Sequence, residues 1–498
     1  MQDFAPSDVL VVPRKRLAQS VLSGIGWLLA QNMGARAIGF ASQIVLARLL
    51  APTDFASLAL AGTVTSIFEA LINFGVDDVL LQRQKAMRFW ATPAFLTSLG
   101  LSVASMLLVI ACSPLAAHLY NAPVLYWILP IMAAGMPLSA LATVPTARIR
   151  ASLNFRFLAI YATGELLVSQ AAVIVLALNG FGVFSFVIPG PILAAVRAAV
   201  FWAVAKPRLG SLRRNQLRMM GSTGSAVFGT KIITALVSQG DYFVLGLFAS
   251  KSELGAYFFA FRLAVQPVYM LAGNLSNVLF PALAQLRSDP VHQREAALSA
   301  CRVLALVIMP YCFMQAAGAR PVFDLLFGPK WDAAVLPLQI LSIGLAFDAV
   351  SWIAGALLSA RGEFRRAFAY SCLFSPFFFV LVTIGARLAS APGVATAVSL
   401  FYVVLAPCFS YLVFRRAGAP LRDVVELYLA PTVFAAIAVG SAAALASRVE
   451  WGPVAQIVII GAVGGGLYLG LVRLFTPTNY GQLVSRLREV TRRRARRA

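Results

Sequence analysis

Residues 93–113 read PAFLTSLGLSVASMLLVIACS, a run without a charged side chain. A helix needs about 20 mainly apolar residues to cross the hydrocarbon core of a bilayer, and this run has that length. Similar runs follow one another along most of the 498 residues, with only short segments between them. Backbone groups cannot stay unpaired in a bilayer, and the runs are too long for barrel strands. The sequence therefore predicts an all-α polytopic membrane protein.

We place fourteen transmembrane spans on these apolar runs. The composition agrees, because 60% of the residues are hydrophobic and 12% are charged, whereas soluble domains carry about 25% charged residues. The expected spans cover residues 20–47, 55–75, 93–113, 124–147, 159–179, 184–204, 222–248, 256–280, 301–319, 338–359, 369–386, 394–414, 424–446 and 453–473.

The positions of the basic residues account for the net charge of +22. If the N-terminus is cytoplasmic, 31 of the 41 Lys and Arg residues lie in inner segments, 6 in outer segments and 4 within spans. This alternation follows the positive-inside rule and predicts that both termini are cytoplasmic. We expect the basic tail at 492–497 to lie on anionic headgroups, so a nucleic-acid partner is not expected.

A weak internal repeat predicts two lobes. Residues 46–58 and 245–257, which are 199 positions apart, both join a long apolar run to the next one through a short outer loop with an acid. Both copies start from the inner side, so the repeat is parallel, an arrangement that transporters use. The longest outer loop, 320–337, is too short for a folded domain. The expected organisation is a cytoplasmic N-terminus (1–19), a six-helix lobe (20–205), a cytoplasmic linker (206–221), a second six-helix lobe (222–414), two additional transmembrane helices (424–473) and a basic cytoplasmic tail (474–498).

Basic residues inside the spans are candidates for function, because a charge within the bilayer is costly. Cations that share a cavity would bind an anionic group such as a diphosphate. The alternative is that each cation is a paired structural charge. The basic candidates and the polar residues on the same helix faces are Arg36 with Asn32 and Gln43 in the first span, Lys231 in the seventh, and Arg262 with Gln266 in the eighth.

Four acids also lie within spans: Glu69, Glu165, Asp241 and Asp348. Such carboxylates can carry a proton or a sodium ion during transport, or they can pair with buried arginines. Asp241 is a poor partner for Lys231, because ten residues place the two about 15 Å apart along a helix. Arg197 lies near the inner end of its span, where its side chain can reach the headgroups.

The sequence shows no enzyme or cofactor site. The five cysteines form no CxxC pair and have irregular spacing, so neither a disulfide framework nor a metal site is expected. Residues 224–231 superficially resemble a nucleotide-binding loop, but Thr and Lys are in reverse order and no strand precedes them. We therefore expect no cofactor, no metal and no ATP hydrolysis by this chain alone.

Four groups of short motifs lie in order between residues 20 and 415. They read LARLLAPTDF at 46–55 with NFGVDDVLLQR at 73–83, LNFRF at 153–157 with Glu165 and GFG at 180–182, DYFVLG at 241–246 with LGAY at 254–257 and LFPA at 279–282, and LFGPKW at 326–331. In order and spacing they resemble the polysaccharide transporter family of the multidrug/oligosaccharidyl-lipid/polysaccharide exporter superfamily.

The resemblance implies a V-shaped pair of lobes around a cationic cavity formed by the first, second, seventh and eighth spans. It implies a flippase, not an enzyme, that moves an undecaprenyl-diphosphate-linked oligosaccharide across the bacterial inner membrane. Transport would proceed by alternating access, driven by an ion gradient or the membrane potential. The implied partners are that lipid-linked oligosaccharide, membrane lipids, and a polysaccharide polymerase with its co-polymerase.

Two other functions remain open from the residues. A multidrug or cation exporter of the same superfamily would share the fold, but it should have an acidic cavity. A membrane glycosyl polymerase or ligase should carry a long periplasmic loop with catalytic residues, which this chain lacks.

Overall fold

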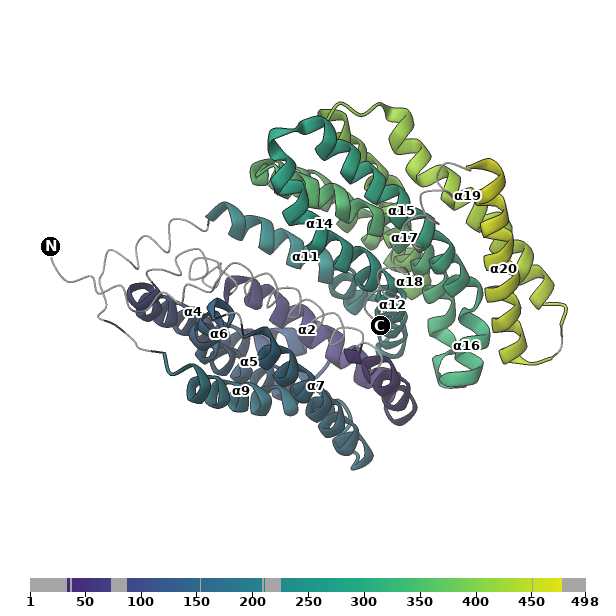
Figure 1. Ribbon diagram of the computed structural model, residues 1–498. Coiled ribbons are helices and arrows are strands. Elements are labelled where there is room, and N and C mark those ends of the chain that lie inside the picture. Colours follow the sequence, from purple (N-terminus) through teal and green to yellow (C-terminus); the bar gives the residue numbers. More distant parts are fainter. Residues whose placement is uncertain are drawn as a thin grey trace. The chain divides into compact units, whose positions relative to one another are not determined.

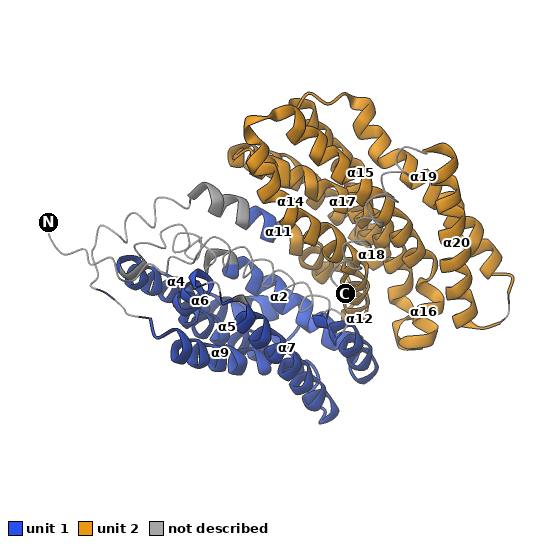
Figure 2. Ribbon diagram, viewed as in Figure 1, with its two compact units in different colours: residues 1–236 blue, residues 237–498 orange. Residues whose placement is uncertain are grey.

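The computed structural model describes residues 34–35, 38–72, 87–152, 154–207, 210, 225–449 and 451–476. Within these ranges the secondary structure is entirely helical (Figure 1). The chain divides into two compact units, residues 1–236 and 237–498, with the boundary inside helix α11 (Ser225–Phe248) (Figure 2). The predicted inter-lobe linker at 206–221 lies mostly outside the described residues.

The helices of the first unit overlap the expected spans from residue 55 onward, whereas the expected span 20–47 lies mostly outside the described residues. These helices are α2 (Pro52–Ile72), α4 (Met87–Leu119), α5 (Leu125–Leu141), α6 (Thr143–Ala151), α7 (Phe155–Leu178), α8 (Phe184–Val187) and α9 (Pro189–Ala205).

The helices of the second unit overlap the expected spans in the same way. They are α12 (Lys251–Ala264), α13 (Gln266–Val268), a π-helical segment (Tyr269–Gly273), α14 (Asn274–Gln285), α15 (Pro290–Ala317), α16 (Ala319–Leu326), α17 (Asp332–Ala360), α18 (Phe364–Arg416), α19 (Leu421–Ala446) and α20 (Pro453–Phe475).

Among the described residues, nine helices are long and apolar enough to cross a membrane. A tenth is obtained when α5 and α6, which meet at a bend of 42°, count as one broken span. The protein is therefore a multi-pass helical membrane protein. The expected outer loop at 320–337 is largely helical, because α16 and the start of α17 occupy most of that segment. Ala319, Pro321 and Phe323 of α16 are buried, so one side of this short helix packs against the bundle.

Helix α18 contains the two expected spans 369–386 and 394–414, which meet at a sharp reversal. The backbone leaves the helical region at Ala389 and Ser390, and Ser390 has a φ of 49°. Gly385 and Gly393 approach so closely here that a Cβ on either would overlap the carbonyl oxygen of the other. Because only glycine lacks that atom, the two arms of α18 can pack together at this point.

The eighth span is interrupted in the middle. It runs through α12, α13, the π-helical segment and α14, and Pro267 lies just before the π turn. Proline has no N–H to donate, and single π turns inside α-helices often mark functional positions. The interruption falls between Gln266 and Asn274, within the polar face that carries Arg262.

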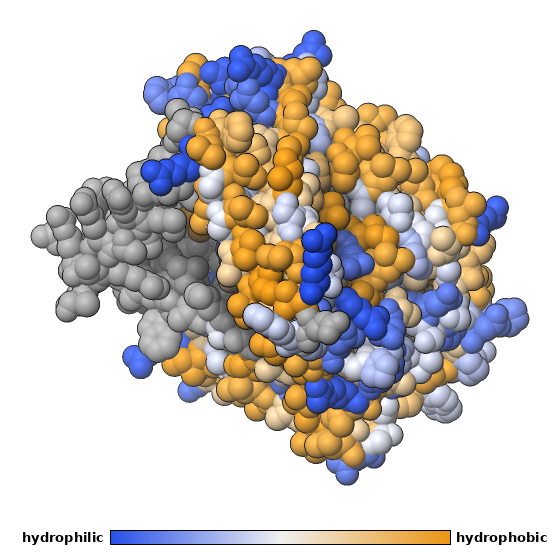
Figure 3. All heavy atoms as spheres, turned by 90° about the vertical axis from the view of Figure 1, so that its right-hand side faces the viewer, coloured by the Kyte–Doolittle hydropathy of each residue, from blue (hydrophilic) through white to orange (hydrophobic). Residues whose placement is uncertain are grey.

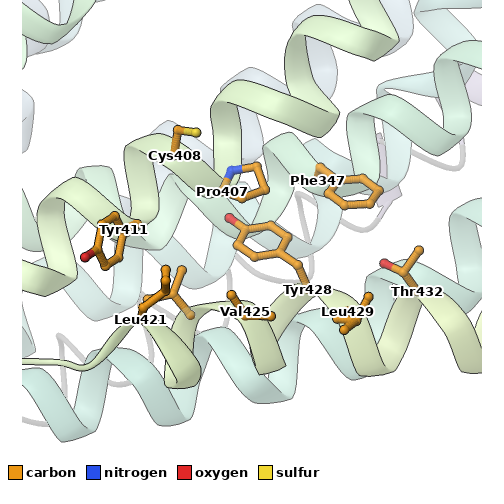
Figure 4. A pocket seen from close by; sticks show the side chains of 10 residues that line it. Phe347, Pro407, Cys408, Tyr411, Leu421, Val425, Tyr428, Leu429 and Thr432 are labelled. Carbon is orange, nitrogen blue, oxygen red and sulfur yellow. The ribbon is translucent and has the colours of Figure 1, made fainter.

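Tyr428 of α19 contacts both α17 and α18. Its ring stacks on Phe347 of α17 at 5.7 Å between centroids, and its hydroxyl is 2.7 Å from Ser410 Oγ of α18. An apolar groove of about 300 Å³ lies beside Tyr428 (Figure 4). Its walls come from three helices and include Pro407 and Leu429.

Large apolar side chains remain exposed on α19 and α20, among them Leu429, Ile437, Val454 and Val458. Figure 3 shows a face that is largely apolar, with hydrophilic side chains gathered in separate patches. A continuous surface of exposed apolar side chains marks an interaction surface. On a multi-pass protein, such a surface matches contact with lipid.

Candidate functional site

Three of the six residues of the predicted anion site have side chains that the structure does not describe. Asn32 and Arg36 lie outside the described residues. Lys231 belongs to α11, but its side chain lies outside them too. Gln43 is described and is buried, with 4% of its surface exposed.

Arg262 is the described member of the predicted set of cations. It lies on α12 in the second unit, and its side chain is exposed although its helix is part of a membrane span. Gln266, one turn further, is half-buried. Within the described part of the chain, no carboxylate forms a salt bridge with Arg262, and its electrostatic neighbour is the Tyr242 hydroxyl. Arg262 thus combines an exposed side chain with the lack of a salt bridge to any described carboxylate.

Asp241 lies in a closed network of hydrogen bonds and aromatic rings. Its side chain is 2% exposed. The Tyr257 hydroxyl donates to Oδ2 at 2.8 Å, and the Tyr242 backbone N–H donates to Oδ1 at 2.9 Å. The Tyr242 ring packs edge-on against Tyr257 and Phe261. Burying a carboxylate without hydrogen-bond donors costs free energy. These hydrogen bonds offset part of that cost for Asp241 inside the span.

Asp348 on α17 is half-buried and accepts hydrogen bonds from its own helix. The Trp352 indole N–H donates to Oδ2 at 2.9 Å, and Ser351 Oγ is 3.3 Å from Oδ1. Tyr402 on α18 interacts electrostatically with both Asp241 and Asp348. Both acids of the second unit thus interact with aromatic side chains, and Tyr402 is common to the two. Among the described residues, no arginine forms a salt bridge with either acid.

Glu69 lines a hollow within the first unit. Its side chain is exposed, and the hollow has a volume of about 370 Å³. Ser139, Phe186 and Gly190 also contribute to the walls. A carboxylate at the edge of such a hollow can accept hydrogen bonds from a ligand or exchange a proton.

Glu165 forms an ion pair with an arginine, which was one of the two roles that the sequence predicted for it. Arg197 Nη1 lies 3.7 Å from Glu165 Oε1, and Arg197 Nη2 donates to Ser139 Oγ at 3.2 Å. Arg197 therefore bonds to residues of α7 and α5. This ion pair favours a paired structural charge for Glu165, and its role in ion coupling stays a prediction.

Sequence reasoning missed Tyr242, Tyr402 and Trp352. Trp352 follows Asp348 by four residues, and this helical spacing predicts that the two side chains are neighbours. Tyr402 is on another helix, and no local pattern connects it to either acid. No group of three metal-binding side chains occurs in the ranges that the structure describes.

Residues 45–336, more than half of the chain, match the profile of a family described as polysaccharide biosynthesis protein. The succinoglycan biosynthesis transport protein ExoT of Rhizobium meliloti (strain 1021) is 29% identical over 339 residues, covering 66% of this chain and 67% of that protein. The lipopolysaccharide biosynthesis protein WzxC of Escherichia coli (strain K12) is 23% identical over 397 residues, covering 78% and 80%.

The fold resembles the solved structure of the lipid II flippase MurJ in an inward closed conformation. The TM-score is 0.73 at 13% identity, and the match covers 91% of this chain and 99% of that one. At this identity the likeness concerns the fold alone.

Proposed function

The chain belongs to the polysaccharide biosynthesis protein family, and we propose that it is a flippase for an undecaprenyl-diphosphate-linked oligosaccharide. It would move this cargo across the bacterial inner membrane during synthesis of a surface polysaccharide. Both termini would be cytoplasmic, as the distribution of basic residues supports. A polysaccharide polymerase with its co-polymerase would act on the exported cargo.

The proposal rests on the exposure of Arg262 and its lack of a salt bridge to a described carboxylate. An arginine within a membrane span is costly, and such residues usually have a partner or a function. Arg262 is exposed and forms no salt bridge with a described carboxylate. Guanidinium offers paired donors that match phosphate oxygens. We propose that Arg262 binds the diphosphate, and that Arg36 and Lys231, with Asn32, Gln43 and Gln266, contribute to binding it.

The acids of the second unit supply a route for energy coupling. Asp241 and Asp348 are held in place by neutral donors and interact with a common tyrosine. A carboxylate in low dielectric is stabilised by a proton or a cation, so occupation of either acid can favour one conformation over another. We propose that these two acids, and Glu69 in the first unit, take part in coupling to a proton or sodium gradient.

The test is transport by the purified full-length chain in sealed vesicles. The substrates are undecaprenyl diphosphate carrying an oligosaccharide and, in parallel, a lipophilic cation. We expect the lipid-linked oligosaccharide to cross without nucleotide, and transport to stop when ion gradients and membrane potential are removed. Transport of the cation alone would support the drug exporter instead. A requirement for ATP without a partner protein would contradict the proposed energy source.

A further inference from the structure

A shallow hollow of about 340 Å³ lies in the second unit between α14 and α17. This volume is near the lower end of the roughly 300–1,000 Å³ of small-molecule sites, enough for a small group. None of the residues around it carries a charge, so an ionic ligand is not favoured. Its walls are formed by Ser276, Asn277, Phe280, Trp352, Ala356 and Ser359.

The Trp352 ring is a fixed wall of this hollow. Its indole N–H donates to Asp348 Oδ2 at 2.9 Å, and the Tyr269 ring packs edge-on at 5.5 Å between centroids. A Cβ built on Gly273 would lie 3.4 Å from the Trp352 ring, so the ring also lies against the π-helical segment. A ring that is held from several sides offers its surface with little loss of conformational entropy on binding.

Neutral polar groups complete the hollow. Asn277 is exposed and Ser359 is half-buried. Ser276 Oγ is buried and has no hydrogen-bond partner among the residues that the structure describes. A fixed aromatic surface beside uncharged amide and hydroxyl groups suits a sugar ring, which has apolar C–H faces and hydroxyl groups at its edge.

The hollow also lies on the polar face of the eighth span. Arg262 and Gln266 precede Tyr269 at helical spacing, and Tyr269, Gly273 and Asn277 all lie beside Trp352. Fifteen residues separate Arg262 from Asn277, or about 22 Å along the axis. A chain of sugars that starts at a diphosphate near Arg262 would reach the hollow beyond its first residue.

We propose that this hollow, the Trp352 subsite, binds one neutral sugar residue of the cargo oligosaccharide and so selects among oligosaccharides. The inference rests on the proposed flippase function. Trp352 would contact the sugar ring, and Asn277 and Ser359 would hydrogen-bond to its hydroxyl groups.

Two variants test the Trp352 subsite in the vesicle assay. Trp352→Leu removes the ring but also the donor to Asp348. Ala356→Leu, one turn further along α17, fills the hollow and leaves that hydrogen bond in place. The control is Trp451→Leu, because Trp451 is 82% exposed between α19 and α20. The probes are undecaprenyl diphosphate carrying the repeat oligosaccharide of the host, and undecaprenyl diphosphate carrying a single hexose.

We expect both subsite variants to transport the oligosaccharide roughly tenfold more slowly than wild type, equivalent to about 1.4 kcal/mol. Transport of the single hexose by Ala356→Leu should be unchanged, because that probe does not reach the hollow. Trp352→Leu also removes the donor to Asp348, so it should slow the single hexose, but less than the oligosaccharide. Equal slowing of both probes would mean a structural role, and unchanged transport of both would mean no contact; either result overturns the subsite and leaves the flippase proposal standing. Failure of the wild-type chain to move either probe would refute the flippase proposal, and the subsite with it.

Discussion

Replacing Arg262 by alanine should slow transport severely while leaving the protein folded in the membrane. Arg262 forms no salt bridge with a described carboxylate, so its removal strands no acid on a neighbouring helix. Its exposed side chain also contributes little to core packing. The loss should therefore fall on binding of the proposed diphosphate and not on stability.

The magnitude follows from the kind of bond that is removed. A hydrogen bond to a charged group contributes about 1.5–3 kcal/mol. At low substrate concentration, transport by Arg262→Ala should thus fall roughly 10- to 150-fold. Arg262→Lys keeps the charge but loses the planar fork, so its rate should lie between those of wild type and Arg262→Ala.

The assay is transport in vesicles, normalised to the amount of protein inserted, with Arg197→Ala as the contrasting variant. Arg197 pairs with Glu165 at 3.7 Å, and the two side chains are 34% and 22% exposed. Its loss should lower stability, because it leaves Glu165 without its ion-pair partner inside a membrane span. We expect less Arg197→Ala protein in the membrane but a normal rate per molecule.

The reasoning would be refuted if well-inserted Arg262→Ala transported at the wild-type rate. It would also be refuted if Arg262→Ala lost protein from the membrane as Arg197→Ala does, since Arg262 would then be a structural charge.

Three further predictions test other parts of the proposal. Arg36→Ala should abolish surface polysaccharide in a complemented deletion strain at a normal membrane level, whereas loss of the protein itself would indicate a structural charge. Reporter fusions after Arg366 should report cytoplasmic and those near Trp331 periplasmic, and a reversal at either would break the span assignment. Hydrogen bonds from the backbone and side chain of His292 lower the pKa of Asp289, the N-cap of α15. The carboxylate's contribution to stability is therefore present at neutral pH and lost as pH falls through that lowered pKa. Thermal unfolding from neutral to acidic pH should show this loss, and an Asp289→Asn variant with the same acid sensitivity would contradict it.

The local chemistry of the chain made several features predictable. Glu165 and the buried arginines are costly charges in apolar runs, so an ion pair could be expected before its geometry was known. The spacing of Asp348 and Trp352 also places them on one helix face. The short helix α16 was missed because the segment 320–337 contains Gly, Pro and charged residues that are typical of loops.

Contacts between distant segments were not predictable in the same way. Tyr257 is 16 residues from Asp241 and on the next helix, so their hydrogen bond depends on how α11 and α12 are rotated about their axes. The reversal of α18 similarly depends on Gly385 and Gly393 meeting across two helices. Nothing in either local sequence requires that approach.

The sequence by itself determined that the chain forms membrane-spanning helices, and its basic residues predicted which way they run. The bilayer imposes both, since it forces each span to satisfy its own backbone and favours basic residues on the cytoplasmic side. Only the tertiary structure decided which polar side chains meet: Asp241 with Tyr257, Arg197 with Glu165, and Trp352 with the hollow beside α14. Those partners are set by lateral packing, because inside a lipid solvent a polar group must find its hydrogen bonds on whichever helix lies beside it.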